Sequence, residues 1–187
     1  MKRLIIGNSG SGKTWLAEQL APLDEAALIH FDDLFWQPGG FEQKREQQEI
    51  LALIAQSKQA SNWIAEGIFG NLARQYLAAA DELIWLDLPL DLCLERLRHR
   101  SAQNTAHMNR QQTEQGLQDL LTWTAQYYDR TTPSSYSGHQ KLFQAFAKTK
   151  HHLCNPDAVE AFWRDRRANL QQATHPESAK HRGEITY

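Results

Sequence analysis

Residues 7–14 carry the clearest chemical signal in the sequence. They read Gly-Asn-Ser-Gly-Ser-Gly-Lys-Thr and match the pattern G-x-x-x-x-G-K-[ST] at every defined position. Glycines let successive backbone N–H groups point at one phosphate group, and a helix that starts after the loop adds a partial positive charge. In such a loop Lys13 contacts the β- and γ-phosphates, and the hydroxyl of Thr14 is a Mg²⁺ ligand. We therefore predict a nucleotide site formed by Gly7, Asn8, Ser9, Gly10, Ser11, Gly12, Lys13 and Thr14.

Carboxylates lie at the ends of several apolar runs that read as strands, namely Asp32, Asp33, Glu66 and Asp87. A carboxylate beside a transferred phosphate can accept the proton of a hydroxyl acceptor or orient Mg²⁺-bound water. Of the first two we favour Asp32 for this role, and the alternative is a helix cap or a solvated strand end. For Asp87 we favour a structural role.

Arg96 and Arg100 are four residues apart in a run that reads as a helix, so their side chains share one face. Planar, permanently charged guanidinium groups can clamp the charge that develops during phosphoryl transfer. We predict this role for both arginines, and the alternative is a solvated basic helix. Arg45 and Arg74 could bind a phosphate of an acceptor or lie on the surface.

The elements that must position these residues follow from the hydrophobic pattern, in which apolar runs alternate with amphipathic runs. Strands are expected over residues 4–6, 27–31, 62–66, 82–87 and 151–154. Helices are expected over residues 14–22, 41–58, 72–79, 90–100, 111–128 and from 156 onward. Pro22 is expected to end the first helix, and residues 131–138 to form a loop. The alternation predicts an α/β fold with a parallel sheet whose strand ends carry the site.

Two other classes of phosphate-loop protein are disfavoured by what the sequence lacks. Guanine-specific GTPases need an N-K-x-D element, and the chain has none. Motor and transporter ATPases usually carry an apolar run followed by Asp-Glu, but here Leu88 follows Asp87 and Gly67 follows Glu66. The layout of a small kinase remains, with a helical segment after the second strand and an arginine-rich lid after the fourth.

Four segments appear in an order that resembles a known family, namely residues 7–14, His30-Phe31-Asp32-Asp33-Leu34-Phe35-Trp36-Gln37-Pro38-Gly39, Trp63-Ile64-Ala65-Glu66-Gly67 and Ile84-Trp85-Leu86-Asp87-Leu88-Pro89. The series is similar to the adenylate-kinase-related proteins often labelled DNA topology modulation proteins, closely over residues 1–100 and in layout over 101–168. The family label does not establish an action on DNA. The resemblance implies a P-loop NTPase of nucleoside/nucleotide-kinase type with a five-stranded parallel sheet flanked by helices, a helical lid, ATP and Mg²⁺.

The resemblance also assigns roles and shows two departures. It implies that Glu66 lies beside the phosphate loop, where the family usually has Asp-Gly, and the longer carboxylate could still hold Mg²⁺-bound water. The Asn-Tyr that usually follows is Ile68-Phe69 here, which removes two polar groups from the acceptor side. The resemblance also implies a lid over about residues 97–130, with lid arginines at Arg96 and Arg100 and with Arg110 or Arg130 as further contributors. The predicted catalytic set is Lys13, Asp32, Glu66, Arg96 and Arg100.

Composition limits the remaining possibilities. The 187 residues, 41% hydrophobic and 22% charged, suit one domain over 1–170 with an acceptor-binding segment near 34–60 and a polar tail over 171–187. Lys plus Arg number 20 against 22 Asp plus Glu, a balance that disfavours nucleic acid as a partner. Two cysteines and no apolar run near the ~20 residues of a bilayer span predict a cytoplasmic protein without membrane contact.

Some residues outside the loop admit two interpretations. Phe35, Trp36 and Phe41 could form a stacking wall for an acceptor ring, although core packing is the commoner role of such side chains. His151, His152 and Cys154 carry donor atoms suited to zinc. They alternate between the faces of a strand and lack a matching second cluster, so we do not expect them to form a metal site together.

The leading hypothesis is an ATP- and Mg²⁺-dependent small-molecule kinase. It would transfer the γ-phosphate to a nucleoside, a nucleotide or another small hydroxyl or phosphate acceptor. The alternative is a nucleotide-binding regulatory switch with slow ATP hydrolysis that acts through a protein or nucleic-acid partner. Only the switch predicts that no small acceptor accelerates ATP use.

Overall fold

The structure is a computed structural model, and it describes residues 1–39, 41, 43–100 and 114–174. The middle of the predicted lid, residues 101–113 with Arg110, lies outside the described residues. So do residues 175–187 of the predicted tail.

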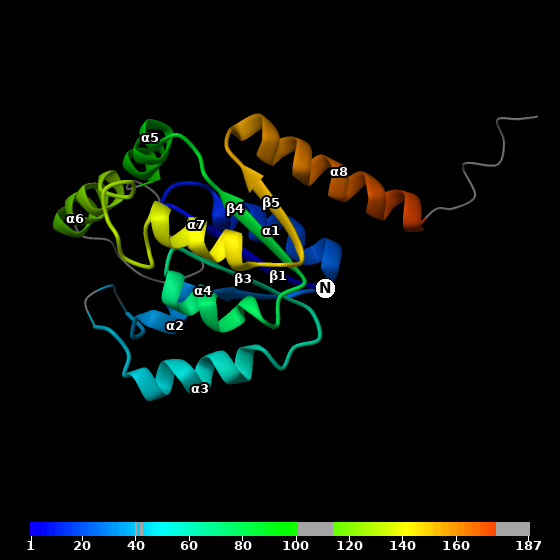
Figure 1. The fold of residues 1–187 in the computed structure, drawn as a ribbon, viewed down its shortest axis with the longest axis horizontal. Helices are drawn as coiled ribbons and strands as arrows, with labels where there is room; N and C mark the ends of the chain where they lie inside the picture. The colour runs from blue at the N-terminus through cyan, green and yellow to red at the C-terminus, as the bar shows by residue number, and fades with distance from the viewer. Residues whose placement is uncertain (40, 42, 101–113, 175–187) are drawn as a thin grey trace, which may run out of the picture.

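The strands form one five-stranded parallel sheet in the order β2-β3-β1-β4-β5. Figure 1 shows this sheet in the middle of the molecule with helices around it. The strands are β1 (Lys2–Gly7), β2 (Ala27–His30), β3 (Trp63–Gly67), β4 (Glu82–Leu86) and β5 (Thr149–Leu153). β3 and β4 are buried along their whole length, as expected for parallel strands covered on both faces. The predicted α/β fold with a five-stranded parallel sheet is confirmed.

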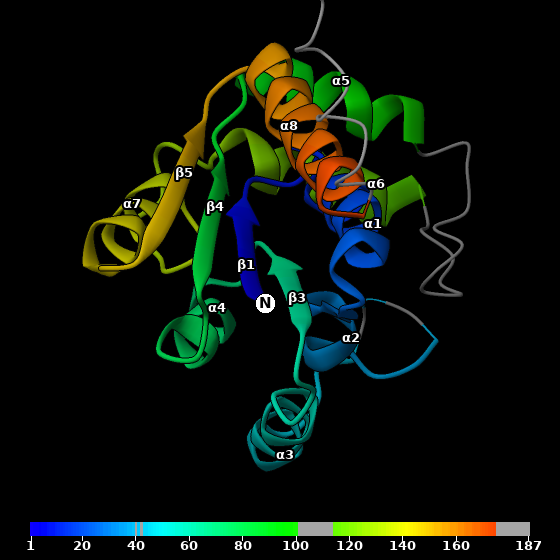
Figure 2. The ribbon, with the colours of Figure 1, turned by 90° about the vertical axis from the view of Figure 1, so that its right-hand side faces the viewer.

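Helices cover both faces of the sheet (Figure 2). They are α1 (Lys13–Asp24), α2 (Phe31–Phe35), α3 (Gln47–Ser57), α4 (Gly70–Leu77), α5 (Leu90–Arg100), α6 (Glu114–Ala125), α7 (Tyr136–Ala145) and α8 (Pro156–Thr174). One hydrophobic core lies between the sheet and α2, α3, α4 and α7. A second core lies between the opposite face and α1, α5 and α8. Packing on both faces fixes the positions of the strands and of their carboxyl ends.

The first helix does not stop where the sequence predicts. Pro22 lies inside α1, which continues to Asp24. The backbone N–H groups of Glu25 and Ala26 both reach the carbonyl oxygen of Ala21, and Glu25 adopts the left-handed conformation. This C-terminal cap holds the last turn although proline contributes no N–H of its own.

Other boundaries also differ from the prediction. Within the expected loop 131–138, Ser135 caps a new helix, because its Oγ accepts a hydrogen bond of 3.2 Å from the N–H of Gly138. The resulting α7 was not predicted. The helix expected over 41–58 begins only at Gln47, and α8 extends to Thr174, into the predicted tail. None of the described helices combines the length and apolar character needed to cross a membrane.

Candidate active site

The phosphate loop connects β1 to α1 at the carboxyl edge of the sheet. Gly10 has φ 77° and Gly12 has φ 92°, both in the left-handed region. A Cβ at Gly10 would lie 2.3 Å from the carbonyl oxygen of Cys93, so no larger residue fits without moving backbone. Gly12 occupies the N-cap of α1, where no side chain caps the helix in the described structure. The first N–H groups of α1 therefore have no side-chain cap competing with an anion at the loop.

Lys13 lies folded over this loop and is 8% exposed. Its Nζ donates a hydrogen bond of 2.8 Å to the carbonyl oxygen of Asn8. The side chain of Asn8 in turn accepts from the N–H of Ser9 at 2.9 Å and donates to the carbonyl oxygen of Thr124 at 3.3 Å. These bonds shape the loop and connect it to the end of α6.

Glu66 is the carboxylate that the fold brings to the loop. β3 pairs directly with β1, so the end of β3 lies beside the start of α1. The hydroxyl of Thr14 donates a hydrogen bond of 2.9 Å to Oε1 of Glu66. The same oxygen lies 2.8 Å from Nδ1 of His30, which is its register partner on β2. Glu66 is 4% exposed, so its carboxylate depends on these partners.

Glu66, His30 and Lys13 shift one another's protonation equilibria or charge environment. Burial favours the neutral acid, but the hydrogen bond to His30 and the charge of Lys13 outweigh it, so the pKa of Glu66 lies below its ordinary value. Burial alone would lower the pKa of His30, but the hydrogen bond to Glu66 and its charge outweigh burial and raise that pKa. An ionised carboxylate beside the Thr14 hydroxyl is the result.

The donor atoms here fit Mg²⁺. A threonine hydroxyl and an ionised carboxylate are the hard oxygen groups that this ion prefers, directly or through its water molecules. Thr14 and Glu66 meet at hydrogen-bond distance beside Lys13, the residue that contacts phosphates in such loops. A carboxylate one methylene longer than the Asp implied by the resemblance therefore still reaches the Thr14 hydroxyl.

His30 was not among the predicted site residues, and the aspartates that were predicted lie further on. β2 ends at His30, and Asp32 and Asp33 occupy the first turn of the short helix α2. The expectation that these aspartates close the strand is wrong, because the chain turns into a helix at Phe31. Acidic residues in a first turn are favoured by the helix dipole. The negative charge of Asp33 also favours the protonated form of His30.

Behind Glu66, a buried histidine supports the turn that leaves β3. Nε2 of His139 donates to the carbonyl oxygen of Ile68 at 2.9 Å, and its Nδ1 accepts from the hydroxyl of Tyr127 at 2.7 Å. Burial lowers the pKa of His139 to about 3, so the imidazole is neutral and can accept as well as donate. The contact ties α7 to the segment directly after Glu66.

The predicted arginines have different surroundings. Arg96 extends from α5 to the phosphate loop, where its Nη1 donates to the carbonyl oxygen of Ser11 at 3.4 Å. Arg100 ends α5, and its side chain is outside the described part of the structure. Arg130 donates to the carbonyl oxygens of Trp123 and Ser134 at 2.7 and 2.8 Å. Arg130 thus fixes the chain between α6 and α7, whereas Arg96 contacts the phosphate-loop motif.

Phe35, Trp36, Phe41 and Phe69, from the segments that follow β2 and β3, form an aromatic cluster. Phe35 and Phe69 stack with ring centroids 4.2 Å apart. Phe69 also contacts Trp36, with ring centroids 6.5 Å apart, so it belongs to the same cluster.

The two arginines considered for acceptor binding differ in their contacts. Arg45 donates to the carbonyl oxygen of Asp33 at 3.2 Å and to Oε1 of Gln37 at 3.3 Å, and it pairs with Glu49. It therefore braces the segment between α2 and α3. Arg74 is exposed on α4.

No protein-family model and no curated protein matches the chain. Solved structures do match it. A gluconokinase from Sinorhizobium meliloti 1021 shares 14% identity over 96% of this chain and 97% of its own, with a TM-score of 0.51. The YorR protein of Bacillus subtilis, solved in complex with phosphorylated GDP, shares 10% identity over 94% and 98%, with a TM-score of 0.52. A shikimate kinase from Bacteroides thetaiotaomicron shares 13% identity over 91% and 98%, with a TM-score of 0.50. The chain has the fold of P-loop kinases.

Proposed function

We propose that this protein is an ATP- and Mg²⁺-dependent small-molecule kinase that transfers the γ-phosphoryl group of ATP to a small hydroxyl or phosphate acceptor. The observation that carries the proposal is the contact between Thr14 and Glu66 beside the buried Lys13. A phosphate loop alone is compatible with many activities. A loop whose threonine meets an ionised carboxylate from the neighbouring strand has the groups needed to hold Mg²⁺ and phosphates together.

The residues of this chain would divide the work as follows. Lys13 and the N–H groups at the start of α1 would hold the phosphates, and Arg96 contacts the loop at the carbonyl oxygen of Ser11. Thr14 and Glu66 would hold Mg²⁺, which neutralises part of the phosphate charge when it is bound. His30 keeps Glu66 ionised and oriented. Arg100 would add a second guanidinium from the same face of α5.

The acceptor would bind beyond the ends of β2 and β3, against the aromatic cluster of Phe35, Trp36, Phe41 and Phe69. Asp32 is our candidate for the group that takes the proton of an acceptor hydroxyl. An Asp32→Asn variant should lose transfer to a hydroxyl acceptor while still binding ATP. If the acceptor is instead a phosphate, already ionised, the variant should keep its activity.

The test is ADP release from ATP·Mg²⁺ in the presence of nucleosides, nucleoside monophosphates, sugars and sugar acids. A Lys13→Ala variant gives the background rate of ADP release. We expect one class of acceptor to raise the rate of the wild-type protein many-fold and to leave the variant unchanged. A slow rate that no acceptor changes, with ATP still bound, would contradict the kinase proposal and favour the nucleotide-dependent switch.

A further inference from the structure

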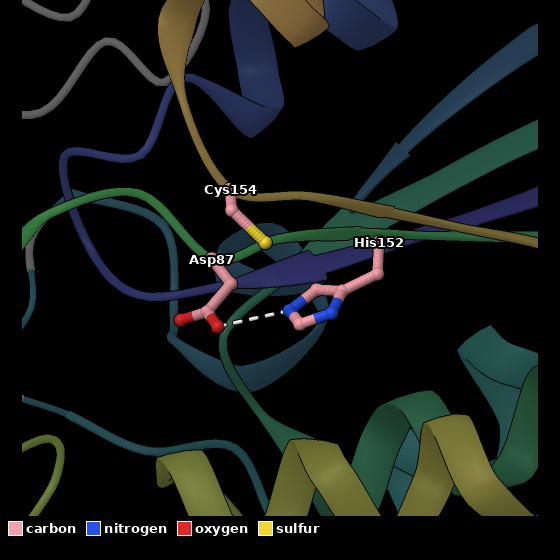
Figure 3. Close-up of side chains that lie close together, drawn as sticks. All are labelled: Asp87, His152 and Cys154. Carbon is pink, nitrogen blue, oxygen red and sulfur yellow. Dashed lines mark hydrogen bonds and ion pairs between the residues drawn. The ribbon is translucent and has the colours of Figure 1, made fainter.

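A second group of reactive side chains lies on the other side of β1 from Glu66. The backbone N–H of Asp87 donates to the carbonyl oxygen of Leu153 at 2.9 Å, so the pairing of β4 with β5 continues past Leu86. His152 lies in β5, and Cys154 follows two residues later, which puts both side chains on the same face. Figure 3 shows Asp87, directly after β4, facing His152 in β5 and Cys154 directly after β5.

The donor atoms of these three residues converge. Nε2 of His152 lies 2.9 Å from Oδ2 of Asp87. The carboxylate oxygen, the imidazole nitrogen and the thiol sulfur all lie within 4.8 Å of one another. A tetrahedral ion holds nitrogen, oxygen and sulfur ligands at about 2.0–2.3 Å, which requires neighbouring donors to be somewhat closer than twice that distance. Side-chain rotations of modest size would therefore close this group around one ion.

Further contacts hold two of these three side chains in position. The ring of His152 stacks on Trp85 with centroids 4.3 Å apart and an interplanar angle of 13°. The hydroxyl of Tyr128 donates to Oδ1 of Asp87 at 3.2 Å, which leaves Oδ2 directed at His152. Outer contacts of this kind fix the orientation of metal ligands and strengthen binding.

The structure replaces one member of the group that the sequence analysis considered and did not expect to bind a metal. His151 was considered with His152 and Cys154, but it points to the opposite face of β5. There its Nε2 lies 3.0 Å from Oε1 of Glu82, and its ring packs against Phe162. The side chain that joins His152 and Cys154 is instead Asp87, 65 residues before His152 in the chain.

We infer that Asp87, His152 and Cys154 form a binding site for one divalent cation of the zinc class, separate from the phosphate loop. The mixed carboxylate, imidazole and thiolate set suits Zn²⁺ and excludes Mg²⁺ and Ca²⁺ as preferred occupants, because those ions take oxygen ligands. The cysteine is exposed and the His152 side chain is 35% exposed, so an ion can enter from solvent and keep a water molecule as its fourth ligand. The ion would tie the end of β4 to the end of β5.

Cobalt provides the direct test, because Co²⁺ occupies zinc sites and a bound thiolate gives it a charge-transfer absorption band. The full chain, without a histidine tag and without nucleotide, is titrated with Co²⁺ and then with Zn²⁺. We expect the band to saturate at one equivalent and to disappear when Zn²⁺ displaces the cobalt. Cys154→Ser should abolish the band, and His152→Ala and Asp87→Asn should weaken binding strongly. Tyr128→Phe should weaken it about tenfold, as for loss of an outer contact.

Two matched variants control for the rest of the chain. Cys93→Ala removes the only other cysteine, which is buried, and His99→Ala removes an exposed histidine. Both should keep the cobalt band. The inference is overturned if no thiolate band forms, or if the band survives in Cys154→Ser or is lost in Cys93→Ala. Asp87 and His152 would then be only a hydrogen-bonded pair.

Discussion

The Thr14 hydroxyl and Oε1 of Glu66 lie 2.9 Å apart, although 52 residues separate them in the chain. The contact exists because β3 pairs with β1 and ends level with the phosphate loop. It joins the phosphate-loop motif to a buried, ionised carboxylate.

Removing the charge of Glu66 should impair transfer more than it impairs folding. In Glu66→Gln the side chain keeps its shape but loses the charge that would hold Mg²⁺, so kcat should fall about 100-fold or more. Glu66→Asp keeps the charge and should retain more activity than Glu66→Gln. Steady-state kinetics of both variants over a range of Mg²⁺ concentrations check this. Equal activity of wild type and Glu66→Gln would contradict a role for the carboxylate.

The pair of His30 and Glu66 should make stability depend on pH. The raised pKa of His30 contributes stability that is fully present below its ordinary value of 6.5 and is lost as pH rises through the folded-state pKa. The lowered pKa of Glu66 contributes stability above its ordinary value of 4.5, which is lost as pH falls through the folded-state pKa. The pair therefore stabilises the fold most between these two ordinary values.

Thermal unfolding of wild type and His30→Gln without nucleotide measures this effect. The difference in Tm between the two proteins should be greatest between pH 4.5 and 6.5 and should shrink as pH rises above 6.5 through the folded-state pKa of His30. A constant difference over that range would mean that the charge on His30 contributes nothing.

Gly10→Ala should destroy nucleotide binding. The new Cβ would lie 2.3 Å from the carbonyl oxygen of Cys93, and φ 77° is unfavourable for alanine, so the loop must move. Gly39→Ala is the matched control, because Gly39 also has a positive φ of 106° but nothing within 4 Å of the new Cβ. Both changes should cost roughly 1–3 kcal/mol of stability through backbone strain. In an ATP titration, only Gly10→Ala should lose affinity.

Arg96→Ala should lower kcat about 10²–10³-fold with a smaller change in KM for ATP, because its guanidinium approaches the loop where charge develops. Arg98→Ala removes the same charge from another face of α5 and serves as the comparison. Kinetics of the two variants at one ionic strength separate a local contact from a general effect of charge. Equal losses in both would argue for a general electrostatic effect.

The parts of the fold and site that depend on local pattern were predictable. The strand, loop and helix around Lys13 and the parallel sheet follow from the motif and the alternation of apolar runs. His30 was missed because its role appears only when β2 pairs with β3 and places it opposite Glu66. Likewise, Asp87 meets His152 only through the pairing of β4 with β5. A sequence pattern does not contain register between strands that are distant in the chain.

The misplaced helices have more local causes. A proline usually ends a helix, and the first helix was therefore expected to end at Pro22. The left-handed cap at Glu25 instead lets α1 complete its last turn beyond Pro22. Ser135 was counted among loop residues, whereas its side chain caps α7. Serine favours loops and helix N-caps for the same reason, which is that its hydroxyl bonds to nearby backbone groups. Composition alone does not separate these two outcomes.

The most direct test of kinase activity follows the phosphoryl group itself. The protein is incubated with ATP labelled at the γ-phosphate, Mg²⁺ and each class of acceptor, and the products are separated to locate the label. We predict that the label appears on one class of acceptor with wild-type protein and is absent from it with Lys13→Ala. Label found only as inorganic phosphate, at a rate that no acceptor changes, would contradict phosphoryl transfer to a small molecule.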